Sequence, residues 1–144
     1  MRAGDRYVSG PARTAPTAEA AASVAEFRVA LRRFLHQTER VARDCGLTPR
    51  WYLLLLLIKG APDLSERSTV TELAERLYLA QSSVTELVDR AEEAGLVRRV
   101  PSAADGRVAH LRLTAEGEER FAEAFQSLAS ERRALRESIA GLDL

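Results

Sequence analysis

Apolar residues in the first third of the chain recur at alternating spacings of three and four. The stripe that they form consists of Val24, Phe27, Leu31, Phe34, Thr38, Val41 and Cys45. This spacing predicts a long helix over residues 18–45, with Thr17 as its N-cap and Gly46 just beyond its end. A stripe this narrow suits pairing with another helix, and burial as an ordinary core helix is the alternative.

A second stripe of the same kind lies near the C-terminus. It consists of Phe121, Phe125, Leu128, Arg132, Leu135, Ile139 and Leu142. Thr114 stands where an N-cap is needed, and Glu116 suits the first turn of a helix. The pattern predicts one last helix within residues 115–144, again suited to pairing between helices.

Shorter helices are predicted between the two stripes. Thr48 and Pro49 open a helix whose run Trp51–Ile58 is apolar nearly all round, as in a helix buried at the centre of a domain. Thr69 and Glu72 have the spacing of a capping box and open the next helix. A turn at residues 78–80 follows it.

A further helix and two strands complete the middle of the chain. The helix over residues 81–94 has an inward face made of Val84, Leu87, Val88 and Ala91. After Gly95, alternating runs at residues 96–100 and 108–113 predict two strands joined by a loop. The fold class is therefore mainly α with a small β-hairpin, and residues 47–114 have the element order of a winged helix-turn-helix.

The helix over residues 81–94 carries polar side chains at the end with which such a helix reads base edges in the major groove. The candidate direct contacts are Gln81, Ser82, Ser83 and Thr85. Glutamine can pair with adenine, and hydroxyls can contact bases or phosphates. Glu86, which could accept a hydrogen bond from cytosine N4, and Arg90 complete the candidates on this helix.

The hairpin carries the local positive charge. Between residues 97 and 112, four arginines stand against one carboxylate, Asp105, which gives a net charge of +3. Three of these arginines are candidate DNA contacts: Arg98, Arg99 and Arg107. Arg107 lies at the hairpin tip, from which an arginine can enter a narrow minor groove.

Acidic residues of the preceding helix oppose this attraction. Residues 81–95 hold four carboxylates against one arginine, a net charge of −3. Asp89 or Glu86 could pair with an arginine of the hairpin, which is the wing of this motif, and so offset the repulsion from phosphates. If the carboxylates stay unpaired, the alternative is an interaction protein that keeps the fold without binding DNA.

The composition limits the other classes of function. The 144 residues include 21 basic and 21 acidic side chains, so the formal net charge is zero and any affinity for DNA must be local. The sequence shows no P-loop, nucleophile elbow or Cys/His zinc spacing, so we expect no enzyme activity, catalytic residue, metal or cofactor. No apolar run is long enough to span a bilayer, no signal core is evident, and Cys45 is the only cysteine; we expect a cytoplasmic protein that does not enter membranes.

Several short sequence motifs within residues 47–121 resemble those of the multiple antibiotic resistance regulator (MarR) family. They include Glu72–Ala74 (ELA), VTELVDRAEEAGLV, the Asp105-x-Arg107 wing tip and Leu113–Gly117 (LTxEG). The resemblance implies a homodimer on a pseudo-palindromic operator in double-stranded DNA, and a repressor released by a small aromatic or lipophilic ligand. It also implies dimerisation helices at 18–46 and 115–144 and a DNA-binding domain at 47–114. Residues 1–17 are rich in Gly, Pro, Ala and Arg, and this composition predicts a mobile arm. Ala80 departs from the family pattern, which usually has a capping Ser, Thr or Asp there, and Glu86 replaces a basic or neutral residue.

In this family the effector binds where the dimer helices meet the DNA-binding lobe. The residues expected to line that site are Phe34, His36, Arg40, Trp51, Tyr52 and Leu55. Aromatic side chains beside a cation suit an acidic aromatic ligand, although packing in the core is the plainer reading for Trp51 and Leu55. Redox sensing through Cys45 is a further alternative, but the helix dipole disfavours a thiolate at that end.

Overall fold

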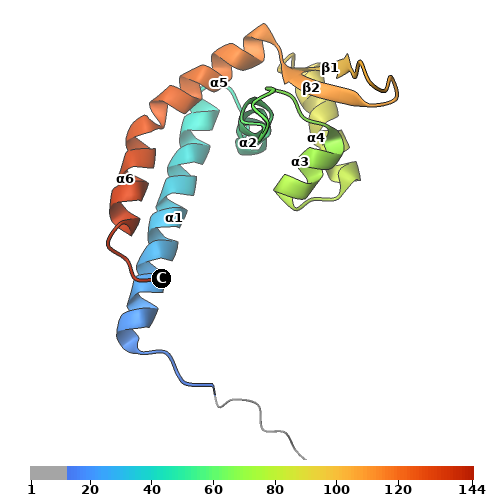
Figure 1. Cartoon of the computed structure of the whole chain (residues 1–144). Coiled ribbons are helices and arrows are strands. Elements are labelled where there is room, and N and C mark those ends of the chain that lie inside the picture. Colours follow the sequence, from blue (N-terminus) through green and yellow to red (C-terminus); the bar gives the residue numbers. More distant parts are fainter. Residues whose placement is uncertain (1–12) are drawn as a thin grey trace, which may run out of the picture.

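The first helix begins and ends at the predicted capping residues. The computed structural model describes residues 13–144, and Figure 1 shows their arrangement. Helix α1 (Ala18–Asp44) opens at Thr17, whose hydroxyl accepts a hydrogen bond of 3.1 Å from the N–H of Ala20. It stops before Gly46, which has a φ of +73°. Residues 13–17 precede α1 without regular structure, and the rest of the predicted mobile arm lies outside the described residues.

Helix α2 (Pro49–Lys59) lies at the centre of the core. The hydroxyl of its N-cap, Thr48, accepts a hydrogen bond from the N–H of Trp51 at 3.1 Å. The helix packs against elements on several sides, so Leu54, Leu55 and Ile58 have no exposed surface. An apolar surface nearly all round is what this central position requires.

Helices α3 (Val70–Leu77) and α4 (Gln81–Glu93) form the helix-turn-helix. The predicted capping box is present: Thr69 accepts from the N–H of Glu72, and the Glu72 carboxylate accepts from the N–H of Thr69. The turn between the helices passes through Tyr78, which has a left-handed backbone. Ala80 is the N-cap of α4 and makes no side-chain hydrogen bond to it.

Strands β1 (Val97–Pro101) and β2 (Ala109–Leu113) form the two-stranded antiparallel hairpin. Val97 is paired with Leu113 at the base of the hairpin, and Pro101 is paired with Ala109 near its tip. The buried residue Ser68, before α3, exchanges backbone hydrogen bonds with Leu111. The hairpin is thus fixed beside the helix-turn-helix, which confirms the predicted fold class.

The C-terminal stripe forms two helices, so the prediction of one continuous helix is wrong. Helix α5 (Ala115–Ser127) ends at Leu128, and α6 (Ala129–Ile139) begins directly after it. The Arg132 guanidinium donates a hydrogen bond of 2.8 Å to the carbonyl of Phe125, which lies in the last turn of α5. The change of direction lets α6 pack along α1, as Figure 1 shows.

Part of the α1 stripe stays uncovered in the single chain. Phe27, Leu31 and Phe34 are half-buried, whereas about half of the Val24 side chain is exposed. The exposed apolar residues of this region lie on α1, α2 and α5: Val24, Val29, Leu35, Leu53 and Phe125. The stripe is therefore mostly half-buried, and the exposed apolar residues of α1 are Val24 of the stripe together with Val29 and Leu35 outside it.

Candidate nucleic-acid interface

The start of α4 presents its polar side chains to solvent. Burial of Val84, Val88 and Ala91 fixes the inner face of the helix. All four residues predicted as direct contacts are consequently exposed: Gln81, Ser82, Ser83 and Thr85. These side chains offer amide and hydroxyl groups of the kind that hydrogen-bond to base edges or phosphates.

An arginine of the hairpin joins β1 to α4. The Arg99 guanidinium donates to a carboxylate oxygen of Asp89 at 2.8 Å and to one of Glu92 at 2.6 Å. The hydrogen bond to Asp89 is the main reason why the pKa of Arg99 is raised above its ordinary value. The expectation that a carboxylate of this helix pairs with a wing arginine is thus confirmed for Asp89.

Glu86 pairs within its own helix rather than with the wing. Its carboxylate accepts a hydrogen bond of 2.7 Å from Arg90, four residues further on. Within residues 13–144, three of the predicted DNA contacts are therefore engaged in ion pairs: Glu86, Arg90 and Arg99. The other two wing candidates, Arg98 and Arg107, are exposed and make no ion pair with any described residue.

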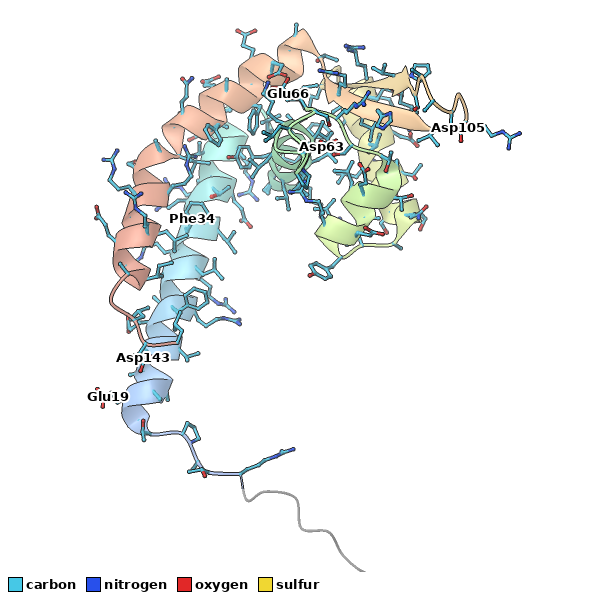
Figure 2. All side chains as sticks on the ribbon, in the orientation of Figure 1. Glu19, Phe34, Asp63, Glu66, Asp105 and Asp143 are labelled. Carbon is cyan, nitrogen blue, oxygen red and sulfur yellow. The ribbon has the colours of Figure 1, made fainter. Side chains whose placement is uncertain are left out.

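Asp105 shapes the hairpin loop through the backbone. Its carboxylate accepts a hydrogen bond of 3.0 Å from the N–H of Arg107, and its carbonyl accepts one from the N–H of Val108. Figure 2 shows Asp105 at the far end of the hairpin, away from the helices. The Arg107 side chain is therefore presented at the tip by a locally braced loop.

The residues predicted for the effector site border separate hollows in the single chain. Phe34 and Tyr52 line a hollow of about 400 Å³ between α1, α2 and the end of α5. Trp51 lines a different hollow, of about 630 Å³, between the start of α2 and α4. His36 lies at a third, on the surface of α1.

The other two residues of that prediction lie elsewhere. Leu55 has no exposed surface and belongs to the core, and the exposed side chain of Arg40 borders none of these hollows. Trp51 and Tyr52 border different hollows because neighbouring residues of a helix point about 100° apart. Leu55 lies one turn after Trp51 on the same side of α2, but it is fully buried whereas Trp51 is half-buried.

The sequence reading missed a cation at the hollow that Phe34 and Tyr52 line. The Arg132 guanidinium lies 4.0 Å from the centre of the Phe125 ring, and both side chains border this hollow. Burial raises the pKa of Tyr52, and the nearby charge of Arg132 partly opposes that shift. The one available signal was that Arg132 interrupts an otherwise apolar stripe.

Cys45 is poorly suited to form a thiolate. Burial raises the pKa of its thiol, and the carboxylates of Glu123 and Asp44 raise it further. Across residues 13–144, no group of three or more His, Cys, Asp or Glu side chains could hold a metal ion. In the same part of the chain, no helix combines the length and apolar character that a membrane span needs.

The α3–α4 pair, the hairpin and the exposed start of α4 together define a winged helix-turn-helix protein. Residues 46–108 match the model of the MarR family. Over these residues the chain is similar to the MarR family, which confirms the resemblance seen in the sequence.

Curated relatives match the same region. The chain is 33% identical over 86 residues to the HTH-type transcriptional repressor IacR of Pseudomonas putida. This match covers 59% of the present chain and 48% of IacR. It is 37% identical over 78 residues to the HTH-type transcriptional repressor MdtR of Bacillus subtilis. This match covers 54% of the present chain and 48% of MdtR. The chain spans about half the length of these relatives.

Solved structures share the fold. A mutant MarR from E. coli complexed with operator DNA has a TM-score of 0.62 at 20% identity, covering 81% of this chain and 79% of that chain. The transcriptional regulator Tm0710 from Thermotoga maritima has a TM-score of 0.59 at 28% identity, and the match covers 78% of this chain and 80% of Tm0710. AbsC, a MarR family regulator from Streptomyces coelicolor, has a TM-score of 0.65 at 22% identity, and the match covers 89% of this chain and 83% of AbsC.

Proposed function

We propose that this chain is a homodimeric transcription regulator that binds double-stranded DNA and acts as a repressor in the cytoplasm. The observation that carries the proposal is the exposed polar start of α4 beside a hairpin that presents Arg107 at its tip. The helix has the dimensions to enter the major groove, and the hairpin arginine has the charge to enter the adjacent minor groove. Two curated relatives named as repressors, and a MarR structure with operator DNA, support this proposal.

The ion pairs of α4 reduce the objection raised by its acidic residues. Asp89 and Glu92 share Arg99, and Glu86 is paired with Arg90. These carboxylates therefore present less uncompensated charge to phosphates than the sequence alone indicates. The alternative, an interaction protein that keeps the fold without binding DNA, loses its main support.

Dimerisation completes the proposed site. The open apolar residues on α1, α2 and α5 give a second copy a surface to cover, so we assign dimerisation to residues 18–46 and 115–144 and DNA binding to residues 47–114. Two copies would place two α4 helices about one DNA turn apart on a pseudo-palindromic operator. The dimer also doubles the local positive charge that a chain of zero net charge can offer.

We assign a small aromatic or lipophilic effector to the hollow bordered by Phe34, Tyr52 and Arg132. The aromatic rings offer apolar contact, and Arg132 offers a partner for a carboxylate. Titration calorimetry with benzoate, and with benzyl alcohol as the uncharged match, tests this part of the proposal. Binding of benzoate that is lost in Arg132→Met supports the assignment, and binding that survives this change refutes it.

Selection from a library of random duplexes tests the DNA-binding function. The full chain is incubated with the library, retained duplexes are amplified, and several rounds are sequenced. The proposal predicts enrichment of a pseudo-palindrome whose half-site centres lie about 10 base pairs apart. Absence of any enriched sequence, with a folded protein, would contradict it.

A further inference from the structure

Tyr78 combines two properties that the isolated chain does not explain. Its side chain is 95% exposed, and its backbone has a φ of +54° and a ψ of +40°. This left-handed conformation is unfavourable for residues with a Cβ atom, and glycine is the usual residue where a helix ends in this way. A large aromatic residue therefore stands where a residue without a side chain would suit the fold better.

The turn itself does not use the ring. The backbone N–H of Tyr78 donates to the carbonyls of Ala74 and Glu75, and the N–H of Leu79 donates to Ala74 at 3.1 Å. A glycine at position 78 could make the same backbone hydrogen bonds. The adjacent Leu79 is partly buried against the core, so it fixes the turn while the phenol extends into solvent.

The position of Tyr78 relates this phenol to the proposed DNA surface. Tyr78 lies two residues before Ala80, the N-cap of α4, and three before Gln81, the first candidate base contact. A helix with its side chains is about 10–12 Å wide, and the major groove is about 12 Å wide. A side chain that projects from the turn just outside the helix therefore reaches the edge of the groove, which is formed by phosphates.

We propose that Tyr78 contacts the DNA backbone, with its hydroxyl donating a hydrogen bond to a phosphate oxygen beside the major groove. The proposal rests on the proposed DNA-binding function and adds a residue to it. A phenol is a neutral donor, and phosphate contacts of this kind fix the register of a recognition helix without reading sequence. The exposed, left-handed tyrosine then serves binding rather than folding.

The variants Tyr78→Phe and Tyr78→Gly separate this role from a structural one. We measure fluorescence anisotropy with a duplex selected by the wild-type chain and with an unselected mixed-sequence duplex. Tyr78→Phe is expected to weaken binding of both duplexes about tenfold or more, because it removes one hydrogen bond to a charged group. The salt dependence of binding is expected to stay unchanged, because a neutral donor replaces no counterion.

Tyr78→Gly is expected to weaken DNA binding at least as much as Tyr78→Phe while leaving Tm unchanged or raised. Opposite effects on affinity and stability are not expected of a residue that only supports the fold. Leu64 provides the matched control, since it is 86% exposed, has a φ of +61° and lies in the loop between α2 and α3. Leu64→Gly is expected to leave DNA affinity at the wild-type value.

Photo-crosslinking from a benzophenone amino acid placed at position 78 identifies the partner of the side chain directly. A crosslink to a DNA strand supports the proposal, and a crosslink only to another protein overturns it. Wild-type affinity of both Tyr78→Phe and Tyr78→Gly would also overturn it while leaving the DNA-binding function intact. Absence of binding by the wild-type chain would instead overturn the DNA-binding function and this proposal with it.

Discussion

Asp89 on α4 and Arg99 on β1 are joined by an ion pair of 2.8 Å, and Glu92 accepts from the same guanidinium at 2.6 Å. The two carboxylates are three residues apart and thus lie on one face of α4. One hairpin arginine therefore links the proposed recognition helix to the wing. The same contact neutralises charge that would otherwise repel phosphates.

Arg99→Ala is expected to lower the free energy of unfolding by about 1 kcal/mol, because both ion pairs are partly exposed and contribute modestly. The Arg99 side chain is 36% exposed, so solvent screens the interaction. Urea denaturation followed by circular dichroism measures the change. A double-mutant cycle with Asp89→Ala is expected to show coupling between the two residues.

The neighbouring Arg98 provides the control for this experiment. Arg98 is exposed and makes no ion pair with any residue from 13 to 144. Arg98→Ala is therefore expected to change stability by less than about 0.5 kcal/mol. Equal losses of stability in Arg98→Ala and Arg99→Ala would show that the link between α4 and β1 is not what stabilises the wing.

Ala80→Ser is expected to raise the free energy of unfolding by about 1 kcal/mol. Ala80 is the N-cap of α4, but its side chain has no oxygen with which to accept from the first backbone N–H groups. A serine hydroxyl can accept one of them. Thermal unfolding measures the gain in stability. Thr69→Val removes the hydroxyl that caps α3, so it is expected to lower the free energy of unfolding by a similar amount. An unchanged Tm in Ala80→Ser would contradict this account of the helix start.

Gly117→Ala is expected to destabilise the protein by about 3 kcal/mol, near the upper end for overpacking. A Cβ atom at position 117 would lie 2.0 Å from the carbonyl oxygen of Leu96. That oxygen also accepts a hydrogen bond from the N–H of Thr114, so a shift would disturb the junction of the hairpin and α5. Gly106→Ala is the control, because nothing lies within 4 Å of its added Cβ. Denaturant titrations with similar midpoints for the two variants would refute the close approach.

Cys45 is expected to react slowly with iodoacetamide at about pH 8, because its raised pKa leaves little of the reactive thiolate. The rate is expected to increase as the pH rises above the ordinary range for a cysteine thiol. Treatment with hydrogen peroxide at neutral pH is expected to leave DNA affinity unchanged. Fast alkylation together with loss of DNA binding after peroxide would revive the redox-sensing alternative.

Local sequence chemistry predicted most of the fold. The caps at Thr17 and Thr48 and the capping box at Thr69 depend on residues three positions apart, so the sequence displays them directly. The hairpin likewise followed from two alternating runs separated by a short loop. These features are set by neighbours in the chain rather than by distant contacts.

Features set by distant contacts were missed. The division at Leu128 has no proline or glycine to mark it, and it accompanies the packing of α6 on α1 and the hydrogen bond from Arg132 to Phe125. The predicted effector residues came from the resemblance to the MarR family; in the single chain Trp51 borders the hollow beside α4, whereas Leu55 is buried in the core. The sequence indicated that a carboxylate of α4 would hold a wing arginine, but only the structure identifies Arg99.

DNA binding through the wing is tested most directly by the salt dependence of binding of the wild-type chain and of Arg107→Ala. Anisotropy titrations with one selected duplex at several salt concentrations give the slope of log K against log salt for each protein. Arg107→Ala is expected to bind more weakly, to have a salt slope smaller by about one per arginine lost, and to keep the wild-type Tm. Equal affinity and equal slope for the two proteins would contradict the assignment of Arg107 and of the wing to DNA.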